Sequence, residues 1–152
     1  MARRTISSVM KPETIAALID RVADVRILRE HHVWAAAEIF GFDDLDSTMR
    51  RKFRALMEAD ALLDAVLSLA ASADPPRSVG NVRHQRGHWV CTVRCDAAGN
   101  RRTATAEHAD FAAAVLASLL ASLQQPTVAH RHRPPSHQHD GSSSHEHQRH
   151  AQ

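Results

Sequence analysis

The composition of this 152-residue chain changes abruptly near Val128, and this change limits how much of the sequence can fold. Beyond that point the sequence consists mainly of His, Pro, Ser, Gln and Arg, without apolar periodicity. Such a segment buries too little apolar surface to offset the entropy that ordering costs. We therefore predict a flexible leader over residues 1–10, one domain over residues 11–126 and a disordered His-rich tail over residues 127–152.

The overall composition is that of a protein with an ordinary folded core. Hydrophobic residues make up 43% of the chain and charged residues 24%, which argues against disorder throughout. Aromatic residues amount to only 4%, with no tyrosine, so the core must be built mainly from Leu, Val, Ile and Ala. Few aromatic rings also count against a surface that stacks nucleic-acid bases. The formal net charge of +2 identifies no partner.

The first residues carry two arginines but no apolar run, so we expect neither a signal peptide nor a membrane span. Two cysteines are fewer than a secreted protein of this size often carries. Both observations predict a cytoplasmic protein.

Apolar residues at a spacing of 3.6 predict helices in the N-terminal half. One helical segment runs from Pro12 to Gly41, and the sequence leaves open whether it is one bent helix or two. A second segment runs from Ser47 to Ser72. Asp60 interrupts its apolar face, and we interpret this residue as the N-cap of a separate helix from Ala61 to Ala71.

After Pro76 the apolar period changes to two, which is typical of strands. We predict a hairpin from His88 to Ala106, and a helix from Asp110 to Gln124 that covers it. The segment before Gly87 is interpreted as a basic loop with one short extended stretch near Val79 to Val82. The predicted fold class is therefore α+β, with a helix-rich N-terminal half, then a β-hairpin packed against a C-terminal helix. A two-stranded sheet is marginal alone, so we expect its edge to pair across a homodimer.

Histidines in the tail are the strongest candidates for chemistry. Neutral imidazoles close together on a flexible chain suit a Zn, Ni or Cu ion, with pH-dependent and unselective binding. The predicted ligands are His130, His132, His137, His139, His145, His147 and His150.

A second cluster of metal-ligand residue types is not expected to bind zinc. His84, His88, Cys91 and Cys95 lie within twelve residues, but a strand points His88 to the face opposite the two cysteines. The same strand holds the cysteine Cα atoms about 13 Å apart, beyond the roughly 7 Å limit for a disulfide. We interpret both cysteines as small buried hydrophobic residues.

Arginines supply an alternative function, the binding of nucleic acid or another anion. On the second helical segment, three arginines cluster while Phe53 turns inward. On the hairpin, Arg94 is expected opposite one of the two later arginines, where like charges need a neutralising partner. The candidates are Arg50, Arg51, Arg54, Arg94, Arg101 and Arg102.

No motif for catalysis is recognisable, and His31 and His32 beside Trp34 and Glu38 are interpreted as the flank of a helix. We therefore expect a small non-enzymatic cytoplasmic protein that acts by protein–protein interaction or self-association and binds a divalent metal through its tail.

Overall fold

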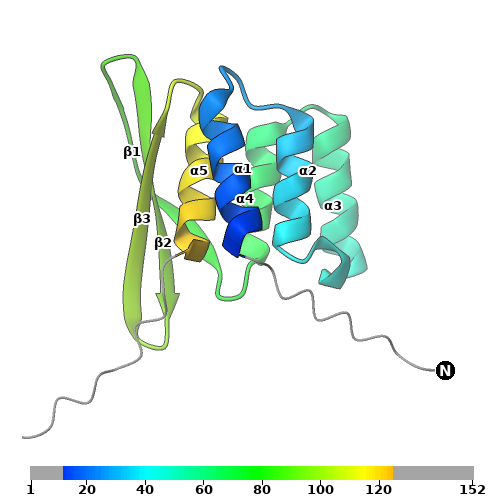
Figure 1. The fold of residues 1–152 in the computed structure, drawn as a ribbon. Coiled ribbons are helices and arrows are strands. Elements are labelled where there is room, and N and C mark those ends of the chain that lie inside the picture. Colours follow the sequence, from blue (N-terminus) through cyan, green and yellow to red (C-terminus); the bar gives the residue numbers. More distant parts are fainter. Residues whose placement is uncertain (1–11, 125–152) are drawn as a thin grey trace, which may run out of the picture.

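The structure, a computed structural model that describes residues 12–124, settles the question of the first helical segment (Figure 1). The segment from Pro12 to Gly41 contains two helices, α1 over Pro12–Asp24 and α2 over Glu30–Ile39. Leu18 and Val22 of α1 are fully buried, as the apolar spacing predicted. After α2, Gly41 adopts the left-handed conformation at φ +72°, which glycine accepts without steric cost.

A short 3₁₀ turn, η1 at Phe42–Asp44, leads into the pair α3, Ser47–Glu58, and α4, Leu62–Ser72. The predicted break between these helices is confirmed, but the predicted capping role of Asp60 is wrong. Asp60 lies in the connecting turn at φ +55°, and Ala61 occupies the N-cap position of α4 without a side-chain bond. Asp60 belongs to the end of α3 and not to the start of α4, because the N–H groups of Asp60 and Ala61 bond back to carbonyls of α3.

Three antiparallel strands follow in the order β1 (Arg77–Gln85), β2 (His88–Ala97) and β3 (Asn100–His108). The predicted hairpin corresponds to β2 and β3. The segment predicted as a basic loop is instead the nine-residue strand β1. Each connection is a two-residue turn whose residues both have positive φ, Arg86–Gly87 and Ala98–Gly99. This is the turn geometry that matches the twist of paired strands.

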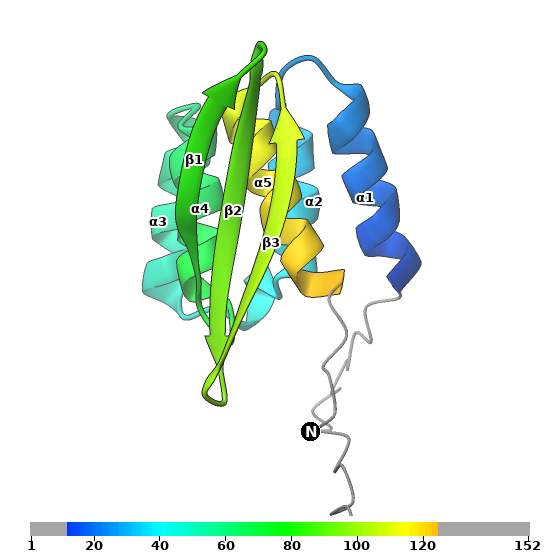
Figure 2. The same cartoon turned by 90° about the vertical axis from the view of Figure 1, so that its left-hand side faces the viewer.

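The last helix, α5 (Phe111–Gln124), packs against β2 and β3 on one face of the sheet. Figures 1 and 2 show the layers: the sheet lies on one side, α5 comes next with α1 and α4 near it, and α2 and α3 lie farthest from the sheet. The opposite face of the sheet has no helix of the described residues over it. The α+β fold class is thus confirmed, with five α-helices in the described part of the chain.

The third strand removes the reason for expecting a dimer, since the sheet has three strands within one chain. Self-association itself is not tested by the structure of a single chain, and it stays a prediction. None of the helices in residues 12–124 has both the length and the apolar character of a membrane-spanning segment.

Candidate functional site

The seven tail histidines predicted to bind metal lie outside the described residues, so their metal binding remains a prediction. Within residues 12–124 no three His, Cys, Asp or Glu side chains are grouped so that they could hold a metal ion.

The two cysteines take the structural role expected of them. Cys91 and Cys95 lie on the inner face of β2, are 0% and 7% exposed, and form no disulfide. Burial raises the pKa of the Cys91 thiol, which keeps it protonated. His84 instead contacts Trp89 in a tilted ring pair, with 4.7 Å between ring centroids, and His88 lies on the outer face. These four residues are not brought together.

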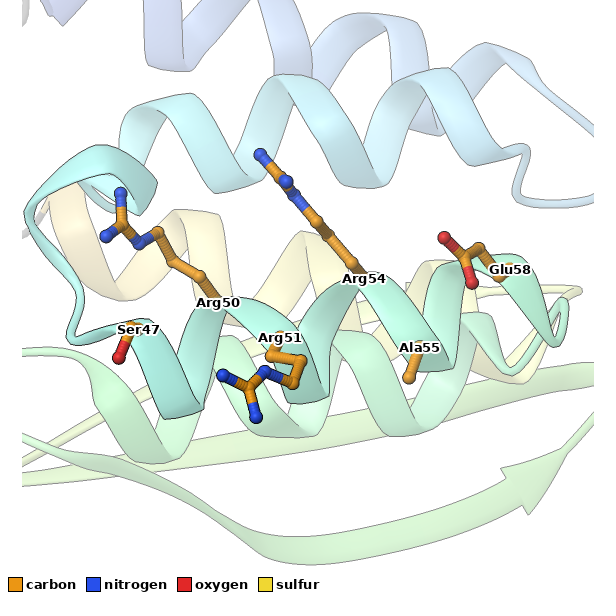
Figure 3. Close-up of a pocket in the computed structure, with 6 residues that line it drawn as sticks. All are labelled: Ser47, Arg50, Arg51, Arg54, Ala55 and Glu58. Atoms are coloured by element: carbon orange, nitrogen blue, oxygen red, sulfur yellow. The ribbon is translucent and has the colours of Figure 1, made fainter.

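The three predicted arginines of α3 line a shallow hollow of about 510 Å³, together with Ser47, Ala55 and Glu58. Figure 3 shows Arg50 and Arg54 pointing to the same side of the helix, while Arg51 points to another. The spacing of four residues places Arg50 and Arg54 one turn apart, as predicted from the sequence. We call these three residues the α3 arginine surface.

An aromatic cluster on the inner side of α3 holds this surface in place. Phe53 is 1% exposed. The centroid of its ring lies 5.2 Å from that of Trp34 in α2 and 5.3 Å from that of Phe42 in η1. The Arg54 guanidinium lies 5.6 Å from the centre of the Phe42 ring, a cation–π distance. Arg54 is thereby positioned by contact with the core.

The positive charge of the α3 arginine surface is not neutralised by ion pairs within the described residues. The ion pair found there is between Arg101 and Asp96, on the sheet. Asp46, the nearest acid before α3, is the N-cap and accepts hydrogen bonds from the backbone N–H groups of Thr48 and Met49 at 2.8 and 2.9 Å. The N–H groups of Thr48 and Met49 are therefore already bonded, which leaves the arginine side chains as the main anion-binding groups here.

The arginines of the sheet do not extend this surface, and their predicted arrangement is wrong. Arg94 lies opposite Thr103 and not opposite Arg101 or Arg102. Arg101 lies opposite Asp96, and its Nε is 3.3 Å from the Asp96 Oδ1 atom. Arg102 lies opposite Cys95 and so belongs to the inner face. The register thus avoids the predicted repulsion between arginines on paired strands. The six candidate arginines do not form one surface, because α3 and the sheet lie on opposite sides of the fold (Figure 1).

The histidine pair at the start of α2 forms part of the helix end, as interpreted from the sequence. His32 is 3% exposed, and its Nδ1 atom accepts a hydrogen bond from the Arg29 N–H at 3.2 Å. Burial, and then the neighbouring His31, lower the pKa of His32, which favours the neutral ring that this bond requires. The Trp34 indole donates to the Glu30 carboxylate at 3.0 Å.

A second hollow, of about 540 Å³, was not predicted. It lies where the α1–α2 loop, the α3–α4 turn and the start of α5 meet. Four acids and one arginine line it, and Ile27 beside them is 56% exposed. Because these acids come from three distant parts of the chain, local sequence patterns carry no signal for the group. The acids are Glu30, Asp60, Asp64 and Asp110.

Comparison with known proteins returns no match, whether the chain is scanned against family models or searched against curated proteins and solved structures.

Proposed function

We propose that this protein is a non-enzymatic cytoplasmic protein that acts by binding an acidic partner protein through the α3 arginine surface. The observation that carries the proposal is that three arginines and a single acid, Glu58, line one hollow, and that none of the three arginines has an ion-pair partner among the described residues. Arginine suits this role because its planar guanidinium binds a carboxylate through two parallel hydrogen bonds.

An acidic protein fits this surface better than a nucleic acid. The six candidate arginines are divided between opposite sides of the fold, which leaves only a small basic footprint on either side. Both tryptophans are occupied within the protein, Trp34 between two phenylalanines and Trp89 between His84 and Phe111. They are therefore not available as platforms for bases.

We expect the double variant Arg50→Ala/Arg51→Ala to bind a polyglutamate peptide roughly tenfold more weakly than the unmodified protein. The measurement is fluorescence anisotropy of the labelled peptide over a series of salt concentrations. The matched control, Arg21→Ala/Arg26→Ala, removes the same charge from other exposed positions and is expected to retain affinity. Equal weakening in both variants would mean that net charge alone drives binding. Tighter binding of duplex DNA, lost in the first variant, would favour nucleic acid as the partner.

A second function, binding of a divalent metal, is favoured by the seven histidines between His130 and His150. We expect the full-length protein to bind nickel or zinc at neutral pH, and a variant with all seven replaced by glutamine to lose this binding. Isothermal titration calorimetry measures it directly, and lowering the pH should release the metal because protonated imidazole is no ligand. Equal metal uptake by the two proteins would rule the tail out as the site.

A further inference from the structure

The strand β1 forms a free edge of the sheet. β1 pairs only with β2 in the described sheet, and Figure 2 shows it as the outermost strand, with α4 behind it. Most of its side chains are exposed. An edge strand with unpaired backbone groups can accept a further extended segment.

The register shows which backbone groups of β1 point outward. In an antiparallel pair joined by a two-residue turn, the residues that flank the turn exchange both backbone hydrogen bonds, and every second pair along the strands does the same. Gln85 and His88 flank the Arg86–Gly87 turn, so His84 and Val82 direct their N–H and C=O groups away from β2. The close contact between the rings of His84 and Trp89 agrees, since side chains approach most closely in such pairs.

Two arginines lie on the outer face beside these groups. Arg83 belongs to β1 itself, opposite Val90. Arg94 belongs to β2, but its side chain crosses the backbone of Gly80 in β1: a Cβ atom added at Gly80 would lie 2.5 Å from the Arg94 Nε atom. Gly80 also coincides with the shift in register between Val79 and Asn81. The absence of a side chain at this position thus lets Arg94 lie across the edge strand.

The charge and the apolar groups around this edge define the occupant. β1 carries two arginines and no acid, and within the described residues neither Arg83 nor Arg94 has an ion pair. On the inner face Val82 is 37% exposed, as is Leu67 of α4, the helix that packs against β1. A strand added here would place alternate side chains beside the two arginines and beside Val82.

We propose that the edge of β1 binds an extended peptide segment of a partner protein in which acidic and apolar residues alternate. Backbone hydrogen bonds to Val82 and His84 extend the sheet, and the acidic side chains pair with Arg83 and Arg94. This surface is separate from the α3 arginine surface, which lies on the far side of the fold (Figure 1), so either can fail without the other.

The probe is a short labelled peptide of alternating valine and glutamate, with the alternating valine and lysine peptide as its counterpart. We expect saturable binding of the glutamate peptide only, weakened roughly tenfold by Arg83→Ala/Arg94→Ala and unchanged by Arg21→Ala/Arg26→Ala. Val82→Pro removes an outward N–H group and should also abolish binding, while Val82→Thr retains that group and should preserve it. In the bound state, the amide hydrogens of Val82 and His84 should exchange more slowly.

Any of four results would overturn this proposal. Full binding to Val82→Pro would exclude strand addition, and full binding to Arg83→Ala/Arg94→Ala would exclude the charge contacts. Self-association of the protein that Val82→Pro abolishes would identify a second copy as the occupant. Loss of peptide binding in Arg50→Ala/Arg51→Ala, with the β1 variants unaffected, would place the peptide on α3 instead.

Discussion

Replacement of Phe53 by alanine is expected to lower the free energy of unfolding by about 3 to 5 kcal/mol. Phe53 is 1% exposed and lies in ring contact with Trp34 and Phe42, so truncation leaves a cavity between α2, η1 and α3. A loss of this size is a large fraction of the stability of a small domain. Urea unfolding followed by tryptophan fluorescence measures it.

The neighbouring residue supplies the control for this prediction. Lys52 is exposed on the same turn of α3, and Lys52→Ala should change the free energy of unfolding by no more than about 0.5 kcal/mol. Trp34 lies beside Phe53, and Trp89 lies on the sheet. In Trp34→Phe and Trp89→Phe backgrounds, the remaining tryptophan should report the same shifted midpoint. A shift seen by Trp34 alone would mean that the helices unfold separately from the sheet.

Most helices could be predicted from the sequence because one face of each is buried in a single core. The spacing of Leu18 and Val22 in α1 and the inward position of Phe53 in α3 follow directly from that geometry. The number of helices between Pro12 and Gly41 could not be predicted. The apolar pattern is ambiguous at Ile27 and Leu28, and in the structure Leu28 is buried while Ile27 is exposed. Tertiary contacts, and not the local apolar pattern, therefore determine where α1 and α2 separate.

The strand β1 was missed because its side chains are mostly exposed and give no alternating apolar pattern. Its partner residues on β2 and the shift in register at Gly80 determine its conformation. The sequence evidence for a hairpin between β1 and β2 is the Arg86–Gly87 pair, since a two-residue turn with glycine in second position is typical of hairpins. Arginine in the first position, at φ +53°, obscured it.

The sequence predicted the candidate site where its residues belong to one helix, and not where they come from several elements. Arg50, Arg51 and Arg54 are neighbours through helical spacing alone, so their grouping was predictable. The position of Arg94 depends on the strand register and on Gly80, two features that come from pairing across the sheet. Contacts that join distant segments therefore account for what the sequence pattern could not predict.

Asp110 makes one such long-range contact, and Asp110→Ala is expected to lower the free energy of unfolding by about 2 to 4 kcal/mol. Its Oδ2 atom accepts hydrogen bonds from the N–H of Ala113, in the first turn of α5, and from the N–H of Leu28, each at 3.1 Å. Leu28 is 82 residues away in sequence and only 3% exposed. Alanine would remove the N-cap of α5 and leave the Leu28 N–H without its partner.

The matched variant Asp110→Asn separates the hydrogen bonds from the charge. One oxygen atom accepts both bonds, so an amide oxygen can replace it, and we expect this variant to lose only about 1 kcal/mol. Urea unfolding measures both variants, and hydrogen exchange at the Leu28 amide should accelerate in Asp110→Ala far more than in Asp110→Asn. Equal losses in the two variants would mean that the negative charge near the N-terminus of α5, rather than the bond to Leu28, accounts for the stabilisation.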